Sequence, residues 1–116
     1  MPSKAIFHME SGDFEMNFEG QKTFPKINKS SFQTLLLLES MGNMSDEFKM
    51  WLDCSLRHGN GPSVPRISIT VMDYDENDIL LDRFYCTSAS PRRWFTKLDT
   101  IREIELDYLE KHNYNI

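Results

Sequence analysis

The chain has few of the residues that build metal centres or covalent cross-links. It contains two cysteines, Cys54 and Cys86, far apart in the sequence and without a CxxC spacing. We expect both to be small buried side chains in a reducing cytosol, not a disulfide. The three histidines are scattered along the chain. We therefore expect no metal site, such as one for zinc, and no cofactor.

Long apolar runs and basic clusters are also missing. No stretch of about 18 apolar residues could span a bilayer, and the first residues lack the apolar core of a signal peptide. Acidic side chains outnumber basic ones by 18 to 13, which gives a formal net charge of −5, and no basic cluster exceeds Arg92-Arg93. We expect no membrane span, no specific nucleic-acid binding and synthesis in the cytosol.

The composition is that of a globular protein. The 116 residues are 40% hydrophobic and 12% aromatic. This length predicts a single domain, residues 1–116, whose core is large enough to fold without a metal or a disulfide.

The stretch 66–86 organises the rest of the chain, because it is typical of two strands joined by a tight acidic turn. Three β-branched residues fall at every second position of its first half: Ile67, Ile69 and Val71. This is the period of a half-buried strand. Residues 75–78 supply turn formers, with Asn77 able to take a positive φ, and 79–86 resumes an extended pattern.

A first hairpin is predicted over residues 4–19. Apolar Phe14, Met16 and Phe18 alternate strictly with polar residues, so one face of the second strand is apolar and the other acidic. Gly20 ends this pattern, and 25–30 is expected to be a connecting loop.

The apolar run 32–39 fits either a helical turn or a strand, and its periodicity does not decide between them. Its short length, and its end near Gly42-Asn43, favour a strand, covered on both faces.

A helix is predicted over residues 46–58. Ser45 can cap its first amides, Asp46 and Glu47 lie at the positive end of the helix dipole, and Gly59 is a natural stop. Residues at three- and four-residue spacing form an apolar stripe that we expect to pack on a sheet. The predicted core anchors of the helix and the central strand are Phe48, Trp51, Leu52, Ile67, Ile69 and Val71.

Two interpretations of the last third compete. Ser90-Pro91 could start a helix, and Thr100 with Glu103 matches a capping box. In the other interpretation, Ile104, Leu106 and Tyr108 alternate with acidic residues, which is typical of a strand. We predict a strand at 104–109. The expected fold is mostly β, a small antiparallel β-sandwich or barrel with one helix, and the alternative is an α+β fold with a second, C-terminal helix.

The order of these elements resembles the tail tube proteins of contractile-tailed phages, whose fold is also seen in type VI secretion tubes. The likeness covers roughly residues 31–110 and departs from the family at Asn77-Asp78, where a turn glycine is common. The segments that carry it are the strand 32–39, Ser45-Asp-Glu-Phe-Lys-Met-Trp-Leu52, Ile67 to Tyr74 with its acidic turn, Leu80 to Cys86, Ser88-Ala-Ser-Pro-Arg-Arg-Trp94, and Ile104 to Tyr108.

The resemblance implies a non-enzymatic structural protein that assembles with itself. Hexameric rings stacked into a tube would form a conduit for DNA ejection, with sheath, baseplate or tape-measure proteins as further partners. Such a protein is found in the virion tail, and in the host cytoplasm during assembly. A second hypothesis is a small acidic phage or bacterial regulatory protein that inhibits a basic, nucleic-acid-binding partner.

No motif in the residues supports catalysis. No nucleophile has a partner histidine in a recognisable motif, and no Gly-rich phosphate loop occurs. The carboxylates at 73, 75, 76 and 78 are expected to form a solvated turn cluster without the spacing of a calcium site. Two further acidic rows would face away from the core and are candidates to line a channel that repels DNA: Asp13, Glu15 and Glu19, and Glu103, Glu105 and Asp107.

Overall fold

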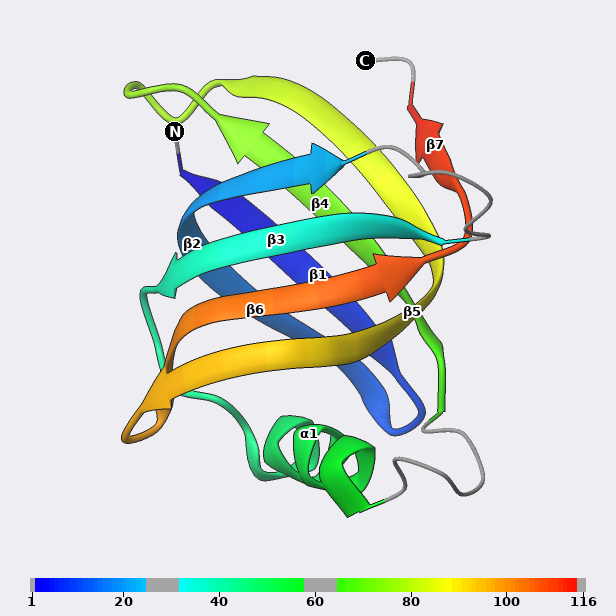
Figure 1. Cartoon of the computed structure of the whole chain (residues 1–116). Helices are drawn as coiled ribbons and strands as arrows, with labels where there is room; N and C mark the ends of the chain where they lie inside the picture. Colours follow the sequence, from blue (N-terminus) through cyan, green and yellow to red (C-terminus); the bar gives the residue numbers. More distant parts are fainter. Residues whose placement is uncertain (1, 25–31, 58–64, 115–116) are drawn as a thin grey trace.

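The computed structural model describes residues 2–24, 32–57 and 65–114, which form seven strands and one helix (Figure 1). The predicted loop at 25–30 and the predicted helix stop at Gly59 lie outside the described residues. The elements are β1 (Ser3–Met9), β2 (Gly12–Phe24), β3 (Gln33–Ser40), α1 (Asp46–Arg57), β4 (Ile67–Tyr74), β5 (Leu80–Lys97), β6 (Thr100–Tyr108) and β7 (Lys111–Asn113).

The strands form one antiparallel sheet that closes on itself. Their order is β4-β1-β2-β3-β6-β5, and β5 also pairs with β4, so the six strands make a closed barrel to which β7 adds at β5. The prediction of a mostly β fold with one helix is confirmed. The alternative of a second, C-terminal helix is wrong, because residues 100–108 are a strand paired on both sides.

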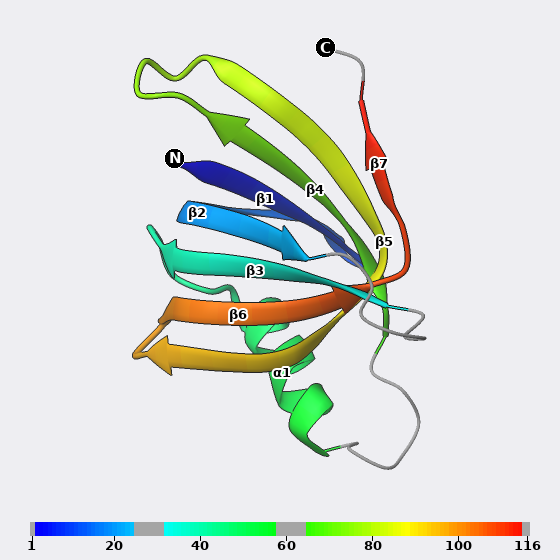
Figure 2. The same cartoon turned by 45° about the horizontal axis from the view of Figure 1, so that its top comes forward.

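Two long strands, β2 and β5, turn the corners of the barrel. Residues 12–18 of β2 pair with β1, and residues 18–24 pair with β3. Residues 80–89 of β5 pair with β4, and residues 90–97 pair with β6. The barrel therefore has two walls, whose strands cross in Figure 1 and spread apart from one side in Figure 2. We call them the β1–β4 wall (12–18, β1, β4, 80–89) and the β3–β6 wall (18–24, β3, β6, 90–97).

The core lies between these walls and follows the two-residue period of the strands. In β6, Ile104, Leu106 and Tyr108 are fully buried, while the residues between them are half-buried on the outer face. The capping-box pattern at Thr100 is overridden, because its hydroxyl donates to the Lys97 carbonyl at 2.8 Å and closes a hairpin turn. Alternation thus outweighs local helix propensity here.

Three features of the strands differ from the predictions. The strand does not end at Gly20, because Leu38 and its neighbours in β3 pair with residues 20–24. Strand β3 is covered on one face and not on both: Leu35 and Leu37 are fully buried, but Leu36 and Leu38 remain partly exposed. Strand β5 runs through Pro91, with a register shift just after it, so no helix starts there.

Helix α1 begins as predicted and covers one open corner of the barrel. The Phe48 amide donates to the Ser45 hydroxyl at 3.2 Å, which is the N-cap bond. The Phe48 ring meets Phe7 of β1 edge-on at a centroid distance of 4.8 Å, and Trp51 lies 6.2 Å from the same ring. Five of the six core anchors are buried, and Ile67 is partly buried at the rim.

The two cysteines and the β4–β5 turn also differ in part from the predictions. Cys54 and Cys86 are free, as expected, but Cys54 is partly exposed. In the β4–β5 turn the positive φ falls on Asp78, at 60°, and not on Asn77. The Asp75 carboxylate accepts the amides of residues 77 and 79 at 2.8 and 2.9 Å, which holds the turn.

Candidate assembly surface

The outer face of the β3–β6 wall carries one of the two predicted acidic rows. Glu103, Glu105 and Asp107 alternate with buried residues of β6 and are half-buried. The strand register places Lys22 and Arg93 in the same row across the wall as Glu105. The face is therefore mixed in charge, and not the purely acidic surface that the β6 sequence suggests.

Arginines neutralise two of these carboxylates. Arg93 lies 3.6 Å from Glu105, and Arg66 donates to Asp107 at 2.5 Å. The Arg66 guanidinium also donates to the Ser88 carbonyl at 2.9 Å, which holds it against the end of the wall. A charge-assisted contact of this kind fixes geometry, while an exposed pair such as Arg93–Glu105 adds little stability.

The other predicted acidic row lies elsewhere. Asp13 and Glu15 point outward from the part of β2 that pairs with β1, so they belong to the β1–β4 wall. Asp13 is 2.8 Å from His8. Glu19 lies at the corner, where β2 passes from one wall to the other. A channel lined by one wall would thus carry one acidic row, not both.

Each side edge of the β3–β6 wall lacks a partner strand among the described residues. Strand β1 stops pairing with β2 at Phe18, so residues 19–24 have β3 alone as a neighbour. Strand β4 stops pairing with β5 at Ala89, so residues 92–97 have β6 as their only neighbouring strand, and α1 lies along this edge, with Lys49 beside Asp99 and Leu52 near Trp94. Pro91 is tolerated in this strand because prolines occur at such edges. Ser55 of α1 donates to its carbonyl at 3.1 Å.

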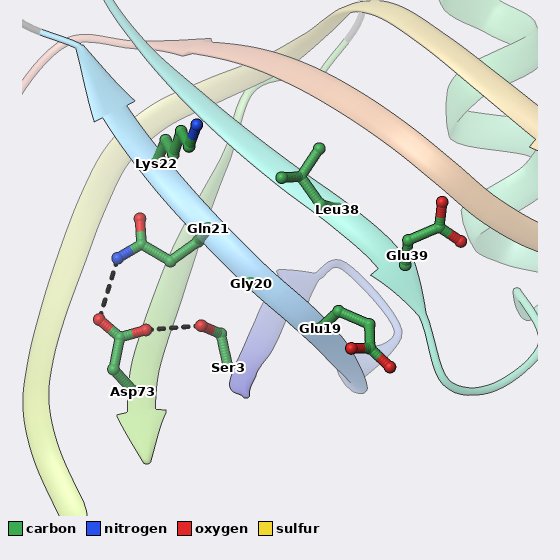
Figure 3. Close-up of a pocket in the computed structure, with 8 residues that line it drawn as sticks. All are labelled: Ser3, Glu19, Gly20, Gln21, Lys22, Leu38, Glu39 and Asp73. Atoms are coloured by element: carbon green, nitrogen blue, oxygen red, sulfur yellow. Dashed lines mark hydrogen bonds between the residues drawn. The ribbon is translucent and has the colours of Figure 1, made fainter. Parts of the chain in front are cut away.

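A buried carboxylate holds the β2 edge in place (Figure 3). The Asp73 side chain accepts the Ser3 hydroxyl at 2.6 Å and the Gln21 amide at 2.9 Å. Asp73 is 8% exposed and Ser3 is 2% exposed. These bonds tie β4 and β1 to the β2 segment beyond the end of β1, so the edge is fixed before any partner arrives.

Sequence reasoning missed this contact. The sequence predicts Asp73 as part of a solvated turn cluster, but it is the last inward-facing residue of β4. The alternation Ile69, Val71, Asp73 was the available signal, because it places the carboxylate on the buried face. A buried carboxylate needs hydrogen-bond donors, and Ser3 and Gln21 supply them.

A hollow lined mainly by polar side chains lies beside this contact. Its volume is about 540 Å³. The described residues that line it contribute hydroxyl, amide, carboxylate and ammonium groups, and include no imidazole or thiol. Within the ranges 2–24, 32–57 and 65–114, no group of three or more histidine, cysteine, aspartate or glutamate side chains is placed to hold a metal ion.

Comparisons with known proteins give no neighbour. No family model, no curated protein and no solved structure matches the chain. In the described part of the chain, no helix is long and apolar enough to cross a membrane.

Proposed function

We propose that the chain is a structural protein that forms the rings of a phage tail tube or a related tube or baseplate component, and that it is not an enzyme. The observation that carries this proposal is the β3–β6 wall, whose edges at residues 19–24 and 92–97 have no partner strand among the described residues. An open strand edge is a template for another chain, and an assembly that pairs it removes an aggregation liability. The β2 edge is open in this way, whereas α1 lies beside the β5 edge and has to move aside when a second copy pairs there.

The number of strands in the wall supports ring formation. The wall has four segments in antiparallel order, so the first and last segments run in opposite directions. When the β2 edge of one copy meets the β5 edge of the next, the new pair is therefore antiparallel like the rest. Repeating this heterologous contact around an axis gives a closed ring with one continuous sheet.

The β1–β4 wall is less suited to this role. At its β5 edge, β7 pairs with residues 84–86 and occupies their backbone hydrogen-bonding groups. This fifth strand also breaks the alternation, because β7 and the β2 segment at the opposite edge run in the same direction. We therefore propose that the β3–β6 wall lines the channel and that the β1–β4 wall, with Asp13 and Glu15, faces outward.

The charge of the β3–β6 wall fits a conduit for a polyanion. Its three carboxylates are largely offset by Lys22, Arg93 and Arg66. Such a surface offers no excess of positive charge to hold DNA phosphates. The alternative, an acidic inhibitor of a basic partner, is less well supported, because two of the carboxylates that it would present are already paired with arginines.

Adjacent proline substitutions at the β2 edge test the ring contact. Neighbouring residues of a strand direct their N–H groups to opposite edges. Proline removes the backbone N–H. In one of the two variants Lys22→Pro and Thr23→Pro, the lost N–H donates to β3; in the other, the lost N–H points to the open edge, and the pairing with β3 is kept. Thermal unfolding identifies the variant that keeps its fold, and sedimentation velocity reports its assembly.

The edge variant is expected to stay monomeric at concentrations where the unsubstituted protein forms rings. Exposed Glu76, at the second position of the β4–β5 turn and outside the β3–β6 wall, provides the matched control as Glu76→Pro, because proline is favoured at this turn position. Rings formed equally well by a folded edge variant would contradict edge-to-edge assembly.

A further inference from the structure

The β5–β6 hairpin ends in an exposed leucine. Lys97 pairs with Thr100, so Leu98 and Asp99 form a two-residue loop. Leu98 is 91% exposed and has a φ of 54°. Glycine is the usual residue at the first loop position of such a turn, because side chains strain the backbone there. A leucine that is both strained and exposed points to a role outside the monomer.

The charges around this tip are arranged asymmetrically. Asp99 is neutralised by Lys49 of α1 at 2.7 Å, and this hydrogen bond raises the pKa of Lys49. The Met44 amide donates to the Asp99 carbonyl at 2.8 Å, which fixes the tip against the start of α1. Lys97 is exposed and has no ion-pair partner among the described residues. The tip therefore presents an apolar side chain next to a free positive charge.

A groove of complementary character lies beside α1. Its volume is about 250 Å³. Its apolar lining includes Met9, Met50, Trp51, Cys54 and Ile67. An apolar cavity of about 150 Å³ is enough to hold benzene, so the groove has room for a leucine side chain.

The rim of this groove is acidic. Glu10 and Glu47 border it, and the Ser11 hydroxyl donates to Glu47 at 2.6 Å, which holds that carboxylate in place. The groove thus offers an apolar floor and negative charge, where the hairpin tip offers a leucine and a lysine.

The tip and the groove lie on opposite sides of α1. Lys49 faces the hairpin, whereas Met50 and Cys54 face the groove. Figure 1 shows the β5–β6 hairpin on one side of the helix and the β1–β2 hairpin, which carries Met9 and Glu10, on the other. A molecule cannot fill its own groove in this arrangement, but it can fill that of a second copy.

We propose that the β5–β6 hairpin tip of one copy docks into this groove of a second copy, with Leu98 on the apolar floor and Lys97 beside Glu10 and Glu47. The contact is heterologous, so each copy can offer its tip to one neighbour and its groove to another, and the contact can repeat along a stack. The hairpin projects from one end of the β3–β6 wall, so this contact would lie between successive rings. This placement rests on the proposed function. Many weak contacts around a ring would then act together.

Removing the leucine gives the first test. Leu98→Gly is expected to weaken self-association by about tenfold or more, since burying a leucine side chain is worth that much in an association constant. The same variant should unfold at the same or a higher temperature, because glycine relieves the strain at this φ. Ile79→Gly, at the exposed β4–β5 turn, is the matched control and should leave self-association unchanged.

A disulfide between copies gives the second test. Copper phenanthroline is the oxidant. The thiol introduced by Leu98→Cys in one copy and the Cys54 thiol of another copy would together lose two protons and two electrons and form one S–S bond. Mass mapping should find this bond in Leu98→Cys and lose it in Leu98→Cys/Cys54→Ala. Ile79→Cys is the control, and the fully buried Cys86 does not compete.

The outcomes separate this contact from the proposed tube. Rings or tubes that form normally with Leu98→Gly, without the disulfide, overturn the docking contact and leave the tube intact. A disulfide and a Leu98-dependent self-association without any ring support the contact and count against the tube. A protein that stays monomeric at all concentrations, without the disulfide, overturns both.

Discussion

Replacing Trp51 with alanine should remove a large part of the stability of the fold. Its side chain is 5% exposed, and its ring lies 5.6 Å from Phe48 and 6.2 Å from Phe7. The indole N–H also donates to the Pro65 carbonyl at 2.8 Å. Truncating a buried aromatic side chain costs about 3–5 kcal/mol, out of a total of about 5–15 kcal/mol for a domain of this kind.

A conservative variant divides this loss between packing and the hydrogen bond. Trp51→Phe keeps most of the ring contacts but leaves the Pro65 carbonyl without its donor, so it should cost about 1–2 kcal/mol. Met50→Ala changes the preceding helical residue, which is 65% exposed, and should shift stability by no more than about 0.5 kcal/mol.

Urea unfolding followed by far-UV circular dichroism measures all three variants. The slope against urea concentration should stay the same, because the folded and unfolded states expose the same surface apart from one side chain. A loss below about 1 kcal/mol in Trp51→Ala, or one equal to that of Met50→Ala, would refute the packing of α1 on the barrel.

Three further predictions follow from the strands and their charges. Leu106→Pro should prevent folding, because β6 is paired on both sides and its backbone donor would be lost; a native circular dichroism spectrum would contradict this. Burial raises the pKa of Cys86 and of Tyr108 to about 12 each, from 9.0 and 10.0. Between about pH 9 and 12 the unfolded chain loses protons that the folded protein keeps, so the free energy of unfolding should fall as pH rises, and less steeply in Cys86→Ala; equal slopes would count against the burial effect. In the proposed tube, Glu105→Lys should leave assembly intact but slow DNA passage in a way that high salt relieves, whereas Glu15→Lys on the other wall should not; equal rates for both variants would exclude the β3–β6 wall as the channel lining.

The parts of the fold that could be predicted are those with a strong local period. The alternation of Ile67, Ile69 and Val71 predicts β4, and the cap at Ser45 predicts the start of α1, because both signals act within a few residues. Two local patterns compete at the start of β6, because Thr100 fits a capping box as well as the hairpin turn in which it lies. There the buried alternation of β6 was the better guide.

The parts that were missed depend on distant residues. The continuation of β2 past Gly20 is set by pairing with β3, which no local pattern encodes. The burial of Asp73 depends on donors at positions 3 and 21, and the open edges depend on where β1 and β4 stop. The tip at Leu98 carries no turn signal, because glycine, the usual residue there, is replaced by leucine.

Negative-stain electron microscopy of the purified protein tests the central claim most directly, because edge-to-edge pairing of the β3–β6 wall has one visible product. The account predicts closed rings of uniform size, alone or stacked into tubes, at concentrations where Lys22→Pro or Thr23→Pro, whichever keeps its fold, shows none. Single particles the size of one folded chain, at every concentration tested, would contradict it.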